Sequence, residues 1–129
     1  MIYVTDTHPF VWLLEGNTRL YQPAQQAFDD TQAQIVIPTI VLTEIKFLYS
    51  RGRILVDLPA ALAHIAASAN CRIQPLDEVV LDKLPTTLNI HDAIIVGTAL
   101  VYRDVLGENV ALITKDQEIT ASGLIPILW

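Results

Sequence analysis

The stretch from Asn89 to Tyr102, NIHDAIIVGTALVY, most constrains how this chain can fold. One acid, Asp92, lies in its first turn, and every residue from Ala93 through Tyr102 is uncharged, so a helix here is apolar almost all round. A helix of that kind belongs in a protein interior. Gly97 lies one turn after Ala93 on the same face, where a small residue lets another backbone come close. The stretch predicts a buried helix with an acid at its mouth.

Asp92 has an ordinary explanation beside a functional one. Asn89 can cap the helix, and a carboxylate at Asp92 is then favoured by the free N–H groups of the first turn and by the helix dipole. Capping alone accounts for this acid. Whether Asp92 also does chemistry therefore depends on where the other acids of the chain lie.

Composition indicates one globular domain with a large core. The chain has 129 residues, of which 52% are hydrophobic, and this richness favours elements that are buried on both faces. No apolar run is long enough to span a membrane, and the opening residues lack the pattern of a signal peptide. The single cysteine, Cys71, excludes an internal disulfide and zinc clusters built on several thiolates. We expect a cytoplasmic protein.

The net charge is −6, from 14 acidic and 8 basic residues. This balance argues against a protein that holds nucleic acid on a broad basic surface. It leaves open a nuclease whose acids gather at a metal site, because bound divalent ions reverse the local field.

Short β-branched runs alternate with helical segments along the whole chain. This alternation is typical of an α/β domain in which a parallel sheet is flanked by helices on both faces. The first strand is predicted to be central and buried, and Thr7 is the expected cap of the helix that follows it. The predicted strands are Ile2–Thr5, Gln34–Ile37, Arg72–Leu76, Val110–Thr114 and Ile125–Leu128.

Four acids are predicted to meet at one edge of this sheet. In open parallel sheets, ligands bind outside the carboxyl ends of the strands, where the strand order reverses. Asp6 directly follows the first strand and Asp116 closely follows the fourth. Asp92 begins the buried helix, and Glu44 lies among apolar residues of a helix that leaves the second strand. A carboxylate in such surroundings is costly unless it is paired, protonated or facing a cation.

A divalent cation is the simplest counter-charge for such a cluster. Like charges this close cannot all stay ionised without compensation, and Lys115 alone does not balance them. Carboxylates and water are the ligands that Mg²⁺ or Mn²⁺ prefers, and no cysteine and histidine spacing favours zinc. Because Mg²⁺ keeps several waters and recruits phosphate oxygens, hydrolysis of a phosphodiester is the leading reaction.

Four segments of the chain resemble, in order and approximate spacing, the acidic motifs of the PIN domain family, especially the VapC-type toxin ribonucleases. These segments are IYVTDTHPFVWLL, TIVLTEIKFLYSRGRI, HDAIIVGTAL and ALITKDQEI. The resemblance covers essentially the whole chain and implies one PIN-like nuclease domain over residues 1–129. It further implies a parallel sheet of about five strands and an Mg²⁺-dependent or Mn²⁺-dependent endoribonuclease.

Matched to these motifs, the acids take separate roles. Asp6, Asp92 and Asp116 are similar to the acids that hold the metal directly or through water, and Glu44 to the acid that orients or deprotonates the attacking water. Two hydroxyls, on Thr7 and Thr114, resemble supporting groups of the family. The neighbouring His8, His91 and Glu118 are expected to pack, to form hydrogen bonds or to face solvent rather than to bind the metal.

The resemblance also implies partners. These are an RNA substrate, an antitoxin protein and a second copy of the chain in a homodimer, with no membrane. Two other classes stay open at this point. One is a catalytically silent PIN-like scaffold that binds a protein, and the other is a receiver-type signalling module, which has a similar length and acids at its strand ends.

Overall fold

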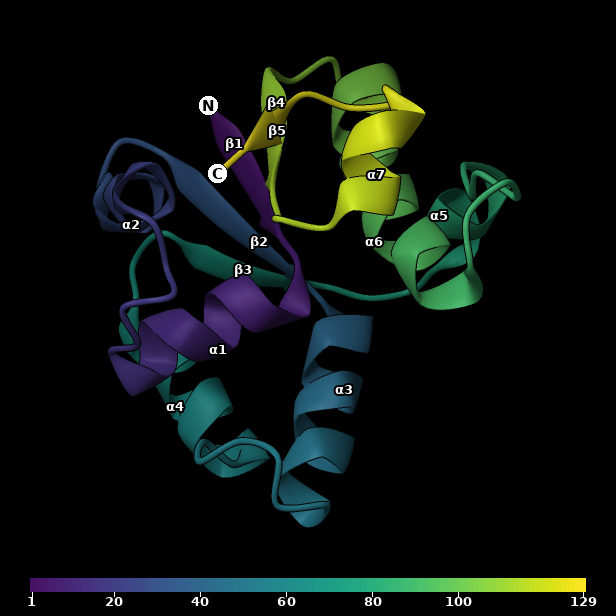
Figure 1. Ribbon diagram of the computed structural model, residues 1–129. Coiled ribbons are helices and arrows are strands. Elements are labelled where there is room, and N and C mark those ends of the chain that lie inside the picture. Colours follow the sequence, from purple (N-terminus) through teal and green to yellow (C-terminus); the bar gives the residue numbers. More distant parts are fainter.

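A five-stranded parallel sheet forms the centre of the computed structural model, which describes all 129 residues (Figure 1). The strand order is β3-β2-β1-β4-β5. The first strand is central, as predicted, because it pairs with β2 on one side and β4 on the other. The strands are β1 (Ile2–Thr5), β2 (Gln34–Pro38), β3 (Cys71–Gln74), β4 (Val110–Ile113) and β5 (Ile127–Leu128).

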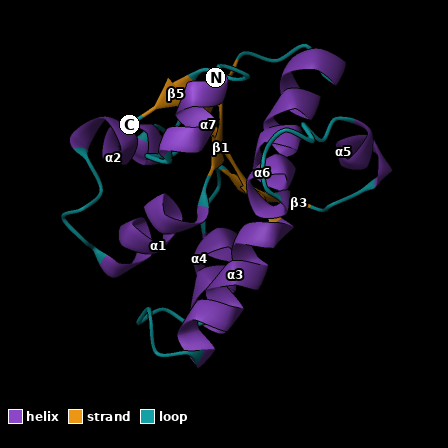
Figure 2. Ribbon diagram, turned by 45° about the vertical axis from the view of Figure 1, so that its right-hand side comes forward, coloured by secondary structure: helices purple, strands orange, loops and turns teal.

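Helices cover both faces of this sheet, as the alternating pattern predicted. In Figure 1, α1, α2 and α4 lie on one side and α6 with α7 on the other. The α3 helix instead projects from the end of the sheet, as the turned view in Figure 2 also shows. The helices are α1 (Thr7–Glu15), α2 (Gln22–Asp29), α3 (Thr39–Ser50), α4 (Leu58–Ala67), α5 (Glu78–Asp82), α6 (Ile90–Leu100) and α7 (Gln117–Ser122).

The core explains the high apolar content of the chain. Val4, Val36 and Leu112, from three neighbouring strands, are fully buried. The middle of α6 is also buried, from Ala93 through Leu100, so this helix lies in the interior as expected. No helix combines the length and the apolar character that a membrane crossing needs.

The α6 helix differs from the prediction at its C-terminal end. The α-helix ends at Leu100, and Val101–Val105 forms a π-helical turn in place of the last predicted α-helical residues. The Leu106 N–H donates to the Val101 carbonyl over 3.1 Å, which closes the wider turn. Tyr102 is buried, and its hydroxyl donates to Gln74 Oε1 at 2.8 Å. Burial was therefore predicted correctly, but the helix type at this end was not.

Gly97 has the role that its position predicted. A β-carbon built on it would lie 3.0 Å from Leu84 Cδ2 and 3.5 Å from Leu84 Cα. The backbone before α6 therefore passes close to the helix at this glycine. A larger side chain would push the two segments apart.

Four predicted strands have different bounds: β2 ends one residue later and β4 one residue earlier than predicted, and β3 and β5 differ by two residues at one end. The last strand is only two residues long, because Ile125 and Pro126, which were predicted to begin it, lie outside the strand. Pro126 has no N–H to donate, but its carbonyl accepts from the Leu112 N–H at 2.8 Å and guides the chain into the sheet. The third strand begins one residue earlier than predicted and ends at Gln74, where the chain turns toward α5.

The strand order also removes one of the open classes. In flavodoxin-like sheets, which include signalling receivers, the first strand lies between the second and the third. Here β1 lies between β2 and β4, so the sheet is not that of a receiver module.

Candidate active site

The strand order reverses at β1 and β4, and the chain places acids at the carboxyl ends of both strands. From β1 the sheet grows in one direction through β2 to β3, and in the other through β4 to β5. The Asp6 N–H donates to the Ile113 carbonyl at 3.0 Å, so the two strand ends stay in register up to Asp6 and Thr114. This is the position at which open parallel sheets bind ligands.

Asp6 is held by two short hydrogen bonds. Its Oδ1 accepts from the Thr7 N–H at 2.7 Å, and its Oδ2 accepts from the Thr114 hydroxyl at 2.7 Å. Asp6 is therefore the cap of α1, and the prediction of Thr7 as the cap was wrong. The physical reason is that Thr7 is already helical and its side chain is buried.

The Thr114 hydroxyl joins two of the acids. It donates to Asp6 and accepts from the Asp116 N–H at 3.0 Å. Asp116 in turn caps α7, because its Oδ1 accepts from the Ile119 N–H at 2.9 Å. The same hydroxyl thus orients the Asp6 carboxylate and the Asp116 backbone, and each carboxylate accepts from the start of the helix that it caps.

Asp92 lies at the start of α6 with the cap that the sequence predicted. The Asp92 N–H donates to Asn89 Oδ1 at 3.0 Å, and Asn89 Nδ2 donates to Asp92 Oδ2 at 2.7 Å. Capping does not separate Asp92 from the other acids: burial raises its pKa most, and the charges of Asp116, Asp6 and Glu118 raise it further. The two readings of this residue are compatible.

Glu44, from α3, faces the same region from another direction. Its Oε1 lies 3.5 Å from His91 Nδ1, so the histidine beside Asp92 contacts the acid of α3. The Thr7 hydroxyl is buried and makes no hydrogen bond of regular geometry. Burial raises the pKa of Glu44, and the nearby Thr7 hydroxyl opposes part of that rise.

Burial and mutual repulsion act on this cluster together. Burial is the largest cause that raises the pKa of Asp6, and the charge of Asp116 raises it further against the hydrogen bonds from Thr114 and Thr7. Burial also raises the pKa of Glu44, and Asp6 adds to that shift. Four acids from four segments therefore influence one another at one edge of the sheet. Such a site favours a bound cation.

The oxygen ligands of this site suit a hard divalent cation, but they are too few to complete its coordination. Carboxylate oxygens with an unpartnered hydroxyl nearby, that of Thr7, suit an ion that binds oxygen and keeps water. No group of three or more histidine, cysteine, aspartate or glutamate side chains is near enough to hold one ion. Water or substrate oxygens have to complete the coordination, as Mg²⁺ commonly requires.

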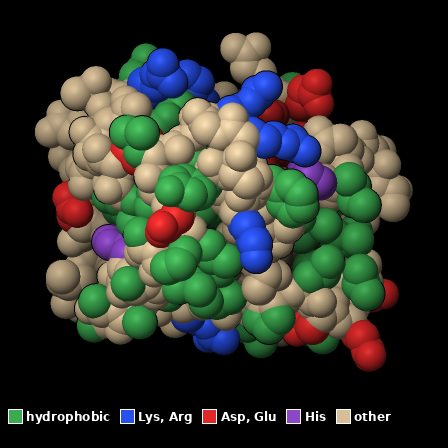
Figure 3. Space-filling model, turned by 90° about the horizontal axis from the view of Figure 1, so that it is seen from below, with side chains coloured by type: hydrophobic (Ala, Val, Ile, Leu, Met, Phe, Trp, Pro, Cys, Tyr) green, Lys and Arg blue, Asp and Glu red, His purple; other side chains and the backbone are tan.

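Two hollows open onto the acids. One, of about 460 Å³, is lined by Asp6 and Asp116 together with His8, Pro9, Trp12, Arg19 and Lys115. The other, of about 400 Å³, is lined by Glu44, His91, Thr43, Phe47, Leu48 and Arg51. Asp92 lines neither of these two hollows. Seen from below, this end of the molecule carries basic, acidic and histidine side chains among apolar ones (Figure 3).

An aromatic row beside the acids was not predicted. The ring centroids of Trp12 and Trp129 are 5.7 Å apart, and those of Trp129 and Tyr21 are 5.3 Å apart. Lys115 Nζ lies 5.4 Å from the centroid of the Trp12 ring. The only signal in the sequence was Trp12 itself, one helical turn after His8. Its contact with Trp129 depends on tertiary packing.

Comparison with known proteins agrees with this geometry. The family model described as PIN domain matches residues 3–122. No curated protein matches the chain. Two solved structures share the fold at 16% sequence identity, namely VapBC2 from Rickettsia felis, bound to a DNA fragment from its promoter, and VapBC-1 from nontypeable Haemophilus influenzae.

Both likenesses extend over nearly the whole chain. The Rickettsia felis structure gives a TM-score of 0.65, over 98% of this chain and 97% of that one. The Haemophilus influenzae structure gives 0.64, over 98% and 96%. At 16% identity, the two structures show only that the fold is shared. The family is shown by the family model, which covers most of the sequence. With a five-stranded parallel sheet and acids at the point where its order reverses, the chain belongs to the PIN domain family.

Proposed function

We propose that this protein is a divalent-metal-dependent endoribonuclease that hydrolyses RNA phosphodiester bonds. One observation carries the proposal. In a chain of the PIN domain family, four carboxylates from separate segments gather at the carboxyl edge of the sheet, where the charge of Asp116 acts on Asp6 and Asp92 and the charge of Asp6 acts on Glu44. A stable protein tolerates such a cluster when a cation occupies it.

Asp6, Asp92 and Asp116 are the residues that would hold the ion, Mg²⁺ or Mn²⁺, directly or through water. When bound, it supplies a water of lowered pKa and stabilises charge on the phosphate oxygens. Glu44 would orient the attacking water or take its proton, because its half-buried carboxyl has a raised pKa. In-line attack on the phosphorus then leaves 5′-phosphate and 3′-hydroxyl ends.

Other side chains position these acids. The Thr114 hydroxyl fixes Oδ2 of Asp6, and the Thr7 N–H fixes Oδ1. Thr7 offers an unpartnered hydroxyl near Glu44, which a water at the site would satisfy. His91 contacts Glu44 and limits its rotation.

We further propose that the protein is the toxin of a toxin–antitoxin pair and forms a homodimer. Both solved relatives are VapBC proteins, and their names describe toxin and antitoxin together. The exposed apolar side chains of Phe47 and Leu55, at 55% and 87% of their full accessibility, leave surface for a protein partner. Copurification with the product of the neighbouring reading frame tests the pairing, and light scattering of each form tests the dimer.

The competing function is a catalytically silent scaffold that binds a protein through the same edge. Incubation of the purified, partner-free protein with varied RNAs and Mn²⁺ or Mg²⁺ separates the two. We expect cleavage that leaves 5′-phosphate ends and stops when the metal is chelated. If the protein binds neither ion and leaves every RNA intact, the scaffold is the correct function.

A further inference from the structure

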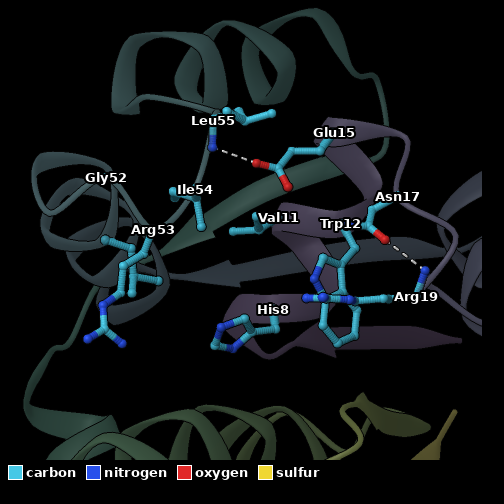
Figure 4. A pocket seen from close by; sticks show the side chains of 11 residues that line it. His8, Val11, Trp12, Glu15, Asn17, Arg19, Gly52, Arg53, Ile54 and Leu55 are labelled. Carbon is cyan, nitrogen blue, oxygen red and sulfur yellow. Dashed lines mark hydrogen bonds between the residues drawn. The ribbon is translucent and has the colours of Figure 1, made fainter.

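A third pocket, of about 460 Å³, adjoins the hollow that contains Asp6 and Asp116 (Figure 4). The two share three lining residues, which are His8, Trp12 and Arg19. A molecule that lies over the acids can therefore continue into this pocket without leaving the surface. The other lining residues are Val11, Glu15, Asn17, Leu48, Gly52, Arg53, Ile54 and Leu55.

Two arginines approach this pocket from separate loops. Arg19 lies between α1 and α2, and Arg53 lies between α3 and α4. In Figure 4 the Arg19 side chain extends across Trp12 toward His8, and Arg53 lies on the opposite side of the pocket with its guanidinium directed away from Arg19. Both residues are exposed, and neither guanidinium belongs to an ion pair of this chain. Two unpaired guanidiniums beside an acidic cluster favour a ligand that carries phosphate.

The one acid in the pocket is already engaged. Glu15 Oε2 accepts from the Leu55 N–H at 2.7 Å, a contact that ties the α3–α4 loop to the end of α1. The Arg19 N–H similarly donates to Asn17 Oδ1 at 2.9 Å, which fixes the other loop. Both arginine-bearing loops are therefore anchored before any ligand binds, and Glu15 holds a loop rather than pairing with either arginine.

The walls select a sugar-phosphate backbone rather than a base. Trp12 is only 7% exposed and Lys115 lies over its ring, so it offers no open face on which a base could stack. The accessible apolar side chains of Ile54 and Leu55 suit the carbon face of a ribose. Charge and shape together fit one nucleotide unit held by its phosphate.

We propose that this Arg19–Arg53 pocket binds the phosphate of the RNA nucleotide next to the cleaved bond, so that the strand runs from the pocket to the acids. This inference rests on the proposed ribonuclease activity. Phosphate contacts carry no base information, and the pocket therefore adds affinity and alignment for any RNA sequence.

The test measures binding of a labelled single-stranded RNA to the whole chain with the divalent metal chelated, so that nothing is cleaved. Arg19→Gln and Arg53→Gln should each weaken binding about tenfold, the size of one charge-assisted contact. Each loss of a phosphate contact should reduce the slope of log K against log salt by about 0.7 for a single strand. Arg72→Gln makes the same charge change on the edge strand β3 and should change neither quantity.

A cleavage assay with metal supplies a second readout. Arg53 does not line the hollow that contains the acids, so Arg53→Gln should raise KM about tenfold while kcat changes less than about twofold. Arg19 lines both hollows, so Arg19→Gln should raise KM and can lower kcat as well. Equal binding, salt slope and KM in Arg19→Gln, Arg53→Gln and Arg72→Gln would overturn the inference even if the wild type cleaves RNA. Loss of all cleavage in the wild type would instead refute the ribonuclease proposal.

Two competing occupants are distinguished by further arms of the same experiment. Inorganic phosphate, titrated at constant ionic strength, should displace the RNA only weakly. If low concentrations of inorganic phosphate fill the pocket and displace all of the RNA, the pocket is a site for a free anion and the RNA assignment is wrong. If the arginine variants retain RNA binding and lose an acidic protein partner, the pocket belongs to that partner and the RNA assignment is wrong.

Discussion

The acids at the carboxyl edge of the sheet, called the acidic edge below, adjoin the Arg19–Arg53 pocket. The two regions differ in how firmly their charged side chains are fixed. Asp6 and Asp116 have short side chains, each oriented by a hydrogen bond from the helix that it caps. Arg19 and Arg53 have long side chains on exposed loops, without ion pairs. The acids are thus fixed before anything binds, and the arginines can adjust. A reacting group needs a fixed position, whereas a binding group needs reach.

The two regions also differ in their effect on stability. Burial and repulsion raise the pKa of Asp6, so its charge at neutral pH opposes folding in the absence of a cation. The exposed arginines carry little such penalty. We therefore expect changes at the acids to alter catalysis greatly and stability measurably, and changes at the arginines to alter chiefly binding.

Replacement of Asp6 should have the largest effect. Asp6→Asn keeps the size of the side chain and can still accept from the Thr7 N–H, but it removes a ligand charge. We expect RNA cleavage to fall roughly a thousandfold or more, as when one member of a catalytic unit is removed. Initial rates on a fixed RNA with Mn²⁺ measure this loss. Asp82→Asn, at an exposed acid of α5, is the matched control and should cleave normally.

Glu44→Gln should have a smaller effect on the same assay. A positioned general base contributes about a hundredfold to ten-thousandfold, and the metal ligands stay in place in this variant. We expect kcat to fall within that range while Mn²⁺ affinity, followed by calorimetry, changes little. Glu78→Gln removes an exposed acid from α5 and serves as the control. Unchanged kcat in Glu44→Gln would remove this residue from the mechanism.

Thr114→Val tests whether the acids need their orientation. The substitution removes the hydroxyl that donates to Asp6 and accepts from the Asp116 N–H. Loss of a group that positions a ligand typically costs about tenfold to a hundredfold in metal affinity or activity. Calorimetric titration with Mn²⁺ should show the weaker binding. In Thr120→Val, the lost hydroxyl bonds only to the Asp116 carbonyl, and metal affinity should stay near that of the wild type.

The smallest effect is on thermal stability without metal. A carboxyl whose pKa is raised by folding binds its proton more tightly in the folded state. Its favourable contribution is complete below the ordinary pKa of 3.8 and is lost as pH rises through the raised value. Asp6→Asn should therefore have a higher Tm than the wild type at about pH 8, with a free energy of unfolding larger by on the order of 1 kcal/mol. Acidification to about pH 5 should narrow the difference.

Divalent ions supply the internal control for that comparison. Because Mn²⁺ binds the folded protein, it should raise the Tm of the wild type at neutral pH and leave that of Asp6→Asn nearly unchanged. A variant that melts below the wild type at every pH would show that the charge of Asp6 stabilises the metal-free fold.

The sequence predicted the acidic edge well, because every step was local. Asp6 and Asp116 follow strands that β-branched runs identify, and the carboxyl ends of parallel strands meet by topology. Asn89 and Asp92 form a capping pair that spacing alone indicates. The strand order confirmed the topology that these signals predicted. Asp6 and Asp116 share one hollow, whereas Glu44 lines another and Asp92 lines neither, so the four acids do not meet in a single hollow. Their catalytic and metal-binding roles stay predictions.

The Arg19–Arg53 pocket could not be predicted in the same way. It depends on the path of the α3–α4 loop, which a contact between Glu15 and Leu55 fixes across 40 residues of sequence. The π-helical turn after α6 was missed for a related reason. It accompanies the burial of Tyr102 against Gln74, a tertiary contact that helical periodicity does not contain. The misplaced α1 cap also depends on tertiary structure, since Thr7 is drawn into the interior.

The π-helical turn has a consequence for how the molecule tolerates insertions. A π turn equals one added residue in an α-helix, and here it is confined to Val101–Val105, at the end of the helix far from Asp92. The extra length is absorbed beyond Leu100, so the phase of the helix is kept from Ile90 to that point. Insertion or deletion of one residue at this end would therefore not rotate Asp92 about the helix axis.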